Sequence, residues 1–473
     1  MNRLFPPPLK FFALALIAAA ALLLRFAPLG AALASPGFPD NISRPDTPGY
    51  LSPARTLAFS GVYEGTGRVP GFPFFLSLCF RASGGEEYRL PAILLTGIGL
   101  LTAALCGAAA WIYAADRKAA AAAALLAAFN LTAIANAPML LSDTLFGLFA
   151  AMQWIIFVIA LRLREPLWLP LAAATAAVGA LIRPINVAWI VPLAVLILLF
   201  PGASWKKRIA AAALSLVLFL SGILPWMSRN HALGAGYTLD TNTGAMLHQN
   251  GAMLLAAVNR SDFEAEKAKL LEEQRELFLD TAAFPDEASR EAWRLRRFRG
   301  LIAAHPFRWI SQHFDWHILL PDVPTFSELF GATTPGRGTM AVLASEGVFA
   351  AVRHYFDGRM WILWVVLPLL IPTALLYFGA AAALFGYLRN FREHWFDLLV
   401  LLAFAEYYFF LPGPITAPRY QIPALPCLSV LAAVALTALF GGSAHKTRVS
   451  AASPKKAAAK GRARGPRPQA TAK

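Results

Sequence analysis

The segment RPDTPGYLSPARTLAFSGVYEGTGRVPGFP, Arg44–Pro73, separates two long apolar stretches of the sequence. It contains five prolines, five glycines and the acid Asp46, and residues of this kind favour turns over a continuous helix. The apolar stretches on either side have the length and composition of membrane-spanning helices. The sequence therefore indicates a membrane protein with an early polar loop at one face of the bilayer.

The composition supports this interpretation. Of 473 residues, 58% are hydrophobic and only 15% are charged, and the mean hydropathy is +0.54. These values, with apolar residues gathered in long runs, predict a polytopic helical membrane protein. Many of the lysines and arginines behind the net charge of +15 lie in short clusters between apolar runs. Such clusters are typical of membrane topology, so no nucleic-acid partner is expected.

About ten membrane-spanning helices are predicted. Their centres lie near Ala20, Gly99, Ala127, Gln153, Thr175, Leu193, Val217, Pro368, Ala403 and Val430. With the N-terminus in the cytoplasm, every short basic cluster falls on the inner side, as the positive-inside rule requires. These clusters are Arg117 and Lys118, Arg162 and Arg164, Lys206 to Arg208, Arg389 and Arg392, and the basic tail.

The same count predicts the domain organisation. Residues 1–440 form an all-α transmembrane domain with an outer loop at 31–75 and an outer helical segment at 230–358. Two amphipathic outer helices are expected between Ser261 and Trp309, with Ser261 or Asp262 as N-cap and Pro285 between the helices. Residues 441–473 are expected to form a disordered, basic cytoplasmic tail.

The first apolar run has two features that bear on its role. It ends in ALAS, which resembles a signal-peptide cleavage site, but a first membrane anchor fits the many spans that follow. Arg25 interrupts the run near its outer end, and its side chain is expected to extend to the lipid headgroups. Three cysteines, Cys79, Cys106 and Cys427, have neither disulfide nor metal-ligand spacing and are expected to be packing residues.

Four charged residues at or near membrane depth are candidate functional residues: Asp46, Asp143, Arg183 and Arg419. A charge at membrane depth costs at least ~2.5 kcal/mol on insertion scales, so it usually has a partner or a function. The predicted topology places all four on the outer side. Each also has a structural explanation. Asp46 suits a turn, Asp143 can cap a helix, and the two arginines can anchor at headgroups.

The ordered set of motifs around these residues resembles one enzyme family. The motifs are DTPGYLSPARTLAFSG with RVPGFPFFLSL, LSDTLF, LIRP, PWMSRN followed by TNTGAMLHQNGAMLLA, AAHPFRWISQH and PRYQIPALP. In this order they resemble the GT-C glycosyltransferases, specifically the branch with protein O-mannosyltransferases, lipid A aminoarabinose transferases and their bacterial relatives. The resemblance extends to about Phe440 and implies a GT-C-like bundle that transfers a sugar from a polyprenyl phosphate.

The resemblance also implies roles for individual residues. Asp46 is expected to be the general base that deprotonates an acceptor hydroxyl, with inversion at the anomeric carbon. Arg419 is the candidate for contact with the donor phosphate, and Arg183 and Arg229 are further candidates. Asp143 would orient an arginine, bind acceptor or help to hold a metal. The candidate substrate-binding residues are Tyr50, Tyr420 and Asn242.

One departure from the family pattern limits these expectations. Protein O-mannosyltransferases have an adjacent acidic pair in the first loop, whereas Asp46 is followed by Thr47 and the next acid is Glu64. This weakens the case for a protein acceptor over a lipid or glycan, and for a metal bridging neighbouring carboxylates. The sequence indicates no metal ligands, and a divalent cation stays an open question. It also does not distinguish hexosyl from pentosyl transfer.

Two other functions compete with this enzyme. A flippase or transporter for lipid-linked saccharide would place charges along a pathway. Glu406 lies deeper than the other acids and suits either such a pathway or an ion pair with an arginine of the bundle. A noncatalytic assembly subunit would tolerate replacement of Asp46. The plain basic start and the absence of a disulfide pattern favour a multi-pass protein of a bacterial inner membrane. Its active site would face the periplasm, and both termini would be cytoplasmic.

Overall fold

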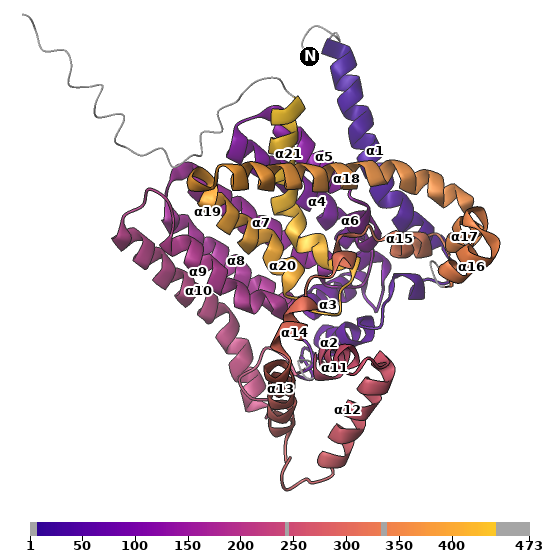
Figure 1. Cartoon of the computed structure of the whole chain (residues 1–473), viewed down its shortest axis with the longest axis vertical. Helices are drawn as coiled ribbons and strands as arrows, with labels where there is room; N and C mark the ends of the chain where they lie inside the picture. The colour runs from indigo at the N-terminus through magenta and orange to yellow at the C-terminus, as the bar shows by residue number, and fades with distance from the viewer. Residues whose placement is uncertain (1–6, 242–245, 333–337, 441–473) are drawn as a thin grey trace, which may run out of the picture.

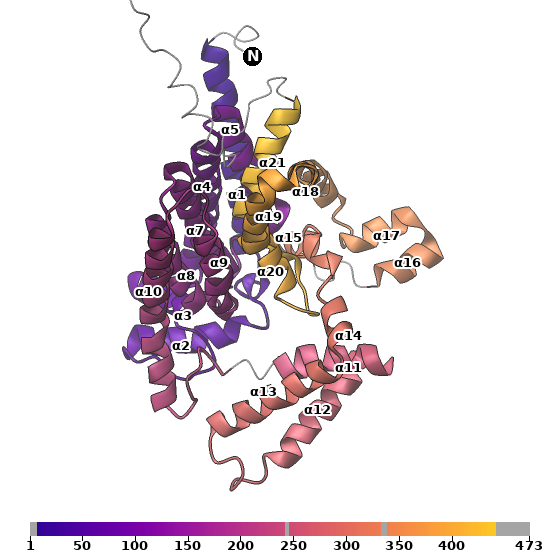
Figure 2. The same ribbon diagram turned by 60° about the vertical axis from the view of Figure 1, so that its left-hand side comes forward.

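The computed structural model describes residues 7–241, 246–332 and 338–440, with side chains from Ala19 onwards. Every regular element in these ranges is helical, as Figure 1 shows. The long helices form a bundle, while α12 and α13 extend below it and α16 and α17 project to one side (Figures 1 and 2). The predicted tail at 441–473 lies outside the described residues.

The helices follow one another along the whole described chain. The α-helices up to residue 232 are α1 (Pro7–Ala34), α2 (Thr47–Phe59), α3 (Gly71–Ser83), α4 (Arg89–Ala114), α5 (Arg117–Ala128), α6 (Leu131–Asn136), α7 (Asp143–Leu163), α8 (Leu169–Ile182), α9 (Ile190–Leu198) and α10 (Trp205–Ala232). The later ones are α11 (Ala252–Asn259), α12 (Phe263–Leu277), α13 (Glu287–Ala304), α14 (Pro306–Ser311), α15 (Val323–Leu329), α16 (Thr339–Glu346), α17 (Val348–Tyr355), α18 (Met360–Arg389), α19 (Phe391–Leu401), α20 (Tyr407–Phe410) and α21 (Leu425–Phe440).

Shorter helical turns connect several of these elements. The 3-10 turns are η1 (Asp40–Ile42), η2 (Pro166–Trp168), η3 (Pro184–Trp189), η6 (Trp316–Leu319) and η8 (Pro418–Ala424). Two further turns are π-helical, η5 (Leu247–Gly251) and η7 (Leu402–Glu406). π-helical turns are rare and are frequent at functional sites, which directs attention to the residues that they carry.

Five helices of the described chain are long and apolar enough to cross a membrane. They are α4, α7, α10, α18 and the continuous helix Pro418–Phe440, which joins η8 to α21. Three shorter apolar helices are found at Ala19–Ala34, Pro166–Ile182 and Pro184–Leu198. These eight segments contain eight of the ten predicted centres, so the predicted count of about ten spans is not confirmed.

The two other predicted centres, Ala127 and Ala403, lie outside these eight segments for different physical reasons. Ala127 lies at the end of α5, whose 12 residues extend only ~18 Å against a hydrocarbon core of ~30 Å. Ala403 lies in η7, and the helical run from α19 to α20 around it also carries Arg392, Glu393, Asp397 and Glu406. These charges lower its hydropathy below that of a typical span.

Small residues let the central helices approach closely. A Cβ on Gly379 of α18 would lie 2.8 Å from the carbonyl oxygen of Ala432 in α21. A Cβ on Gly107 of α4 would lie 3.0 Å from the Cβ of Ala124 in α5. Glycine and alanine at such crossings are typical of helix packing in membranes, where close contact replaces the hydrophobic effect as the driving force.

Arg25 does not extend to the headgroups as predicted. It is 1% exposed and donates hydrogen bonds to the carbonyl oxygens of Ala127 (2.9 Å), Ala128 (3.1 Å) and Ala133 (2.7 Å). Carbonyls in the last turn of a helix have no partner within it, so Arg25 satisfies groups left open where α5 ends and α6 begins. Gly99 of α4 leaves space for this guanidinium, because a Cβ there would lie 3.1 Å from Nη1.

The predicted amphipathic helices are present as α12 and α13. Asp262 caps α12 by accepting from the amides of Glu264 and Ala265, and Asp286 and Ser289 form a capping box at the start of α13. Pro285 lies between the two helices, as expected. Their position on the outer side of a membrane stays a prediction of the topology.

The buried guanidinium of Arg25 gives the first testable prediction. Arg25→Leu should lower the free energy of unfolding by about 2 kcal/mol or more, because buried acceptors that lose their donors cost about 1–3 kcal/mol each. Thermal unfolding in detergent, followed by tryptophan fluorescence, measures the change. Arg296→Leu, at an exposed position of α13, is the control. Equal midpoints for the two variants would contradict a structural role for Arg25.

Candidate active site

Asp46 lies where the loop between α1 and α2 ends and α2 begins. It is the residue before the helix, and its side chain makes no capping hydrogen bond. Its Oδ1 instead accepts from Nη2 of Arg68 at 2.9 Å, and its Oδ2 lies 3.7 Å from Nη2 of Arg419. The prolines at 45 and 48 favour a helix start here. The loop therefore presents the carboxylate to cations instead of using it to cap α2.

Two hydrogen bonds fix this loop against the segment before α7. The Thr47 hydroxyl donates to the carbonyl oxygen of Leu140 at 3.1 Å, and the Leu140 amide donates to the carbonyl oxygen of Ile42 at 2.9 Å. Thr47 is 1% exposed, so these bonds lie in the interior. They hold Asp46 close to Asp143, although 97 positions separate the two residues in the sequence.

Asp143 is the first residue of α7, and its side chain is 4% exposed. Its carboxylate accepts a hydrogen bond from the guanidinium of Arg183 and lies 3.8 Å from Nε of Arg419. A carboxylate also interacts favourably with the positive end of a helix. Because Ser142 occupies the cap position, Asp143 is placed to hold the two arginines instead of capping the helix.

The two arginines reach Asp143 from different parts of the chain. Arg183 lies between α8 and η3 in an extended conformation, which the following Pro184 favours. Arg419 is the second residue of η8. Both guanidinium carbons lie 5.2 Å from the centre of the Tyr420 ring, within the range of cation–π attraction. Tyr420 thus links the two cations at the site.

Arg68 is a site residue that the sequence analysis missed. Its guanidinium lies 4.6 Å from the centre of the Tyr50 ring and pairs with Asp46. A Cβ on Gly49 would lie 2.9 Å from its Nε, so the glycine provides the space. Burial lowers the pKa of Arg68, but Tyr50 and Asp46 raise it by more, which keeps the side chain charged. In the sequence, Gly49 and Arg68 both follow Asp46 within the segment 44–73.

These residues form one continuous ion-pair chain, Arg68–Asp46–Arg419–Asp143–Arg183. Three guanidinium groups against two carboxylates give the chain a net charge of +1. Arg419 lies 3.7 and 3.8 Å from its two carboxylates, beyond the distance of a hydrogen bond. Its five N–H donors are therefore in a position to bind a further anionic oxygen.

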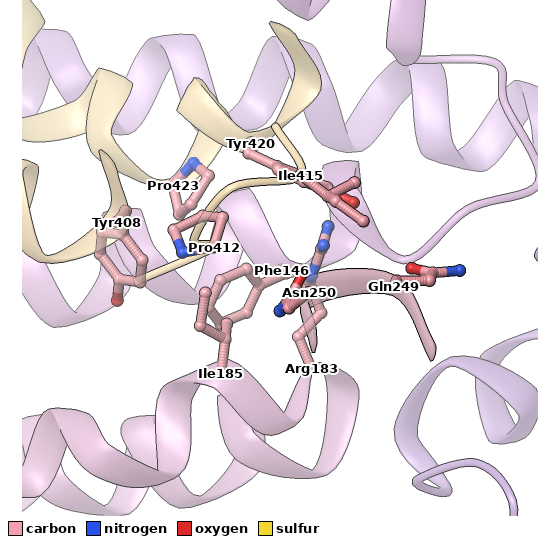
Figure 3. Close-up of a pocket in the computed structure, with 10 residues that line it drawn as sticks. All are labelled: Phe146, Arg183, Ile185, Gln249, Asn250, Tyr408, Pro412, Ile415, Tyr420 and Pro423. Carbon is pink, nitrogen blue, oxygen red and sulfur yellow. The ribbon is translucent and has the colours of Figure 1, made fainter. Parts of the chain in front are cut away.

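A polar pocket of about 170 Å³ opens beside Arg183 and Tyr420 (Figure 3). Gln249 and Asn250 reach it from the π-helical turn η5. The other lining residues are Phe146, Ile185, Tyr408, Pro412, Ile415 and Pro423. The sequence analysis quoted the motif that contains Gln249 and Asn250 but assigned them no role. Their pattern gave no signal, because a π-helical turn is not visible in the sequence.

An apolar groove of about 910 Å³ runs along the neighbouring helices. Its walls include Val191 of α9, Leu402 of η7, Phe410 of α20 and the end of α18 at Leu388. The polar pocket is lined by Ile185 just before α9 and by Tyr408 of α20. The segment from η3 to α9 and the helix α20 therefore contribute residues to both spaces, and the groove adjoins the pocket.

Glu406 is the one charged residue among those that line this groove. It ends the π-helical turn η7 and also lines a smaller apolar cavity of about 340 Å³ next to the loop at Phe314. The sequence analysis left its role open between a pathway and an ion pair. The structure places its carboxylate among apolar side chains of the groove.

Two other candidates, Arg229 and Tyr50, make contacts within the protein. Arg229 of α10 donates to the carbonyl oxygens of Gly65 and Tyr63, so it supports the loop between α2 and α3. Tyr50 is 8% exposed, packs against Phe72 and shares a 3.3 Å hydrogen bond with Ser142. Its ring packs against the guanidinium of Arg68, and the side chain is buried instead of facing a substrate cavity. Asn242 lies outside the described residues.

In the described part of the chain, no group of three or more histidine, cysteine, aspartate or glutamate residues is arranged to hold a metal ion. The charge of Asp46 is balanced by Arg68, and the charge of Asp143 is balanced by Arg183. The three cysteines are free and buried, as expected of packing residues.

No protein-family model matches the sequence, and no curated protein matches it. Two solved structures are similar to it. One is the archaeal oligosaccharyltransferase AglB from Archaeoglobus fulgidus in complex with an inhibitory peptide and a dolichol-phosphate, with 15% identity and a TM-score of 0.47. The other is an Archaeoglobus fulgidus oligosaccharyltransferase in the apo form, with 16% identity and the same TM-score.

Each match covers 91% of this chain and 51% of the other, so the chain spans about half the length of those proteins. Similarity at this level carries no argument about activity. Donor, acceptor and site residues are therefore argued from the geometry of this chain.

The burial of the two acids predicts different costs of removal. Asp143→Ala should lower the free energy of unfolding by about 3–5 kcal/mol, because it leaves Arg183 without its buried partner. Asp46→Ala should cost about 1 kcal/mol or less, because that side chain is 45% exposed. Thermal unfolding in detergent distinguishes them. A larger loss of stability for Asp46→Ala than for Asp143→Ala would contradict this prediction and show that the pair of Arg68 and Asp46 contributes more to stability.

Proposed function

We propose that the protein is a membrane glycosyltransferase that moves a sugar from a polyprenyl-phosphate donor to an acceptor hydroxyl. The observation that carries the proposal is the ion-pair chain from Arg68 to Arg183, which has a net positive charge and reaches the polar pocket through Arg183. The apolar groove adjoins this pocket, because Tyr407 of the groove donates a hydrogen bond to the carbonyl oxygen of Ile185 in the pocket wall. A donor of this class has an apolar tail, an anionic phosphate and a polar sugar. Its three parts match the three features of the site.

The groove supports a lipid tail as part of the donor. Its lining is almost entirely aliphatic and aromatic, and it is formed by α9, α18, α19 and α20. A tail in this groove would bring the phosphate towards Arg183 and Arg419. The planar guanidinium of an arginine can donate two parallel hydrogen bonds to phosphate oxygens. These hydrogen bonds strengthen as negative charge develops on the leaving phosphate.

The position of Asp46 supports its role as general base. Arg68 holds Oδ1 at 2.9 Å, while Oδ2 lies 3.7 Å from Arg419 and the side chain is 45% exposed. Oδ2 can therefore accept the proton of an incoming hydroxyl. The hydroxyl oxygen forms a bond to the anomeric carbon as the bond from that carbon to the phosphate oxygen breaks. The polyprenyl phosphate leaves with the electron pair, and attack from the opposite face inverts the configuration.

The pocket lining also favours a class of sugar. It contains the cation Arg183, the amides of Gln249 and Asn250, and the hydroxyls of Tyr408 and Tyr420, and none of the ten residues drawn in Figure 3 is an acid. Amide and hydroxyl groups bind sugar hydroxyls. A sugar ammonium group is disfavoured by the net charge of +1 of the ion-pair chain that includes Arg183. We therefore infer a neutral or anionic sugar, as hexose or pentose.

The remaining features of the proposal rest on the topology. Residues 1–440 would form the catalytic transmembrane domain, with the loop at 31–75 and the segment at 230–358 on the periplasmic side of a bacterial inner membrane and both termini in the cytoplasm. The acceptor is a lipid, glycan or protein that reaches Asp46 from that side. A flippase for lipid-linked saccharide is the alternative. The ion-pair chain favours the enzyme because its charges are gathered at one place.

Replacing the base tests the proposed function directly. Asp46→Asn should lower sugar transfer by about 10²–10⁴-fold, the usual contribution of general base catalysis, and leave donor binding in place. The measurement uses purified protein in lipid with a panel of radiolabelled polyprenyl-phosphate sugars. Glu64→Gln removes an exposed acid from the same loop and is the matched control, with transfer unchanged.

Two results would overturn parts of this assignment. Equal transfer by Asp46→Asn and the native chain would remove Asp46 from catalysis. A native protein that moves the labelled donor across the bilayer, without transferring its sugar, would favour the flippase. Loss of donor binding in Arg419→Ala, with binding kept in Arg229→Ala, would support phosphate contact by the first and loop support by the second.

The sugar class has its own test. In the same panel, a donor with a cationic amino sugar should be transferred at least tenfold more slowly than its neutral counterpart. An unpaired like charge ~4 Å away would cost about 4 kcal/mol at an effective dielectric constant of ~20. Asp143 cancels much of this repulsion from Arg183, and the tenfold difference requires that only about 1.4 kcal/mol remains. Gln249→Glu adds an acid at an exposed position of the pocket and should narrow this difference. Faster transfer of the amino sugar by the native chain would contradict the inference.

A further inference from the structure

Helices α16 and α17 form a short hairpin that projects from the bundle, as Figures 1 and 2 both show. Gly347 alone connects them and serves as the end of one helix and the start of the other. Its φ is +85°, a value that side chains rarely adopt, so glycine permits this tight connection. The hairpin therefore has a defined shape despite its length of eight residues per helix.

One side of the hairpin is held firmly by the bundle. Ala351 and Phe356 are 4% and 5% exposed. Phe356 belongs to a buried cluster with Ile362 and Val366 of α18, and Val352 packs against the same cluster. The hairpin consequently moves with α18 and is not a freely hinged loop.

The other side exposes large apolar residues. Phe349 is 90% exposed, Met340 is 74% and Val348 is 66% exposed, and Leu343 adds a further partly exposed side chain. Single exposed apolar residues are ordinary on protein surfaces. Four of them are gathered on two short helices that pack against each other, and exposed apolar residues concentrated in this way mark an interaction surface.

The position of the hairpin identifies the partner. Only residues 356–359 connect α17 to α18, a length that spans at most ~14 Å. Helix α18 is one of the five helices able to cross a membrane, and it begins with Trp361 and Trp364, which are 48% and 71% exposed. Exposed tryptophans at the end of a membrane-spanning helix are typical of the boundary between headgroups and acyl chains. A short connection of this kind keeps the apolar side chains of the hairpin close to these tryptophans, and the tryptophans favour contact with lipid at this end of α18.

We propose that the hairpin of α16 and α17 lies on the outer leaflet, with Met340, Val348 and Phe349 inserted among the lipid acyl chains. An amphipathic helix in this position buries its apolar face just below the headgroups. Arg353, exposed near the end of α17, is placed to meet lipid phosphates. Helix α12 differs in that its surface carries ion pairs such as Lys269 to Glu266 and Arg275 to Glu272.

Site-directed spin labelling tests the proposal without reference to any enzymatic activity. The native cysteines at 79, 106 and 427 are buried, so added surface cysteines can be labelled selectively. The variants Met340→Cys and Phe349→Cys carry the label on the apolar side. Ser345→Cys is the matched control, because it lies on the opposite side of α16 from Leu343, and Glu272→Cys on α12 is a second control.

Each labelled full-length protein is placed in nanodiscs of phosphatidylethanolamine and phosphatidylglycerol. The collision rate of the label is then measured with oxygen, which concentrates in acyl chains, and with a water-soluble nickel chelate. Labels at 340 and 349 should show a severalfold higher ratio of oxygen to nickel accessibility than labels at 345 and 272. Equal ratios at all four positions would overturn the proposal, because the patch would then face water.

A second copy of the chain is the other possible cover for the patch, and the same samples detect it. Spin–spin broadening at position 349 that disappears on dilution with unlabelled protein would place this patch between two copies and overturn the lipid assignment. Unbroadened spectra with high oxygen accessibility support lipid contact. A monodisperse profile of each variant in detergent shows that it has folded.

Discussion

The ion pair between Asp143 and Arg183 is the interaction on which the site depends. Both residues lie at the ends of apolar helices, where a lone charge would be costly, and the Asp143 side chain is almost fully buried. Each therefore requires the other, and the pair fixes the start of α7 against the junction of α8 and η3. Arg419 and then Asp46 and Arg68 extend this pair to the segment between α1 and α3.

This arrangement separates structural from chemical roles within one set of charges. The pair of Asp143 and Arg183 is hydrogen-bonded, and its carboxylate is buried. Asp46, at the other end of the ion-pair chain, is 45% exposed, and its Oδ2 lies 3.7 Å from Arg419. A buried pair at one end can hold the geometry while an exposed acid at the other end exchanges protons. Arg419, with long contacts to both carboxylates, connects the two functions and is the natural position for an anionic group.

The sequence predicted the four charged residues of the site because intramembrane charges are rare and their cost is large. It could not predict Arg68 with the same argument, since an arginine in a polar loop carries no such cost. Gln249 and Asn250 were missed because their approach to the pocket depends on a π-helical turn. Arg25 was misjudged because its partners, the open carbonyls at the end of α5, are backbone groups that no sequence pattern displays. The predicted count of about ten spans is not confirmed. Helix α5 is too short to cross a membrane alone, and the helical run around η7 carries too many charges to be counted as a span.

The two π-helical turns have a consequence for how this fold can diversify. Each contains one residue more than an α-helical turn would, which rotates the side chains that follow it by about 100° relative to an uninterrupted helix. The turn η5 carries Gln249 and Asn250 at the polar pocket, and η7 carries Glu406 at the apolar groove. The deletion of one residue in either turn would exchange the side chains that face its cavity and leave the rest of the bundle in register. Related chains can therefore change what they bind through insertions and deletions of single residues, without any change in the helices that cross the membrane.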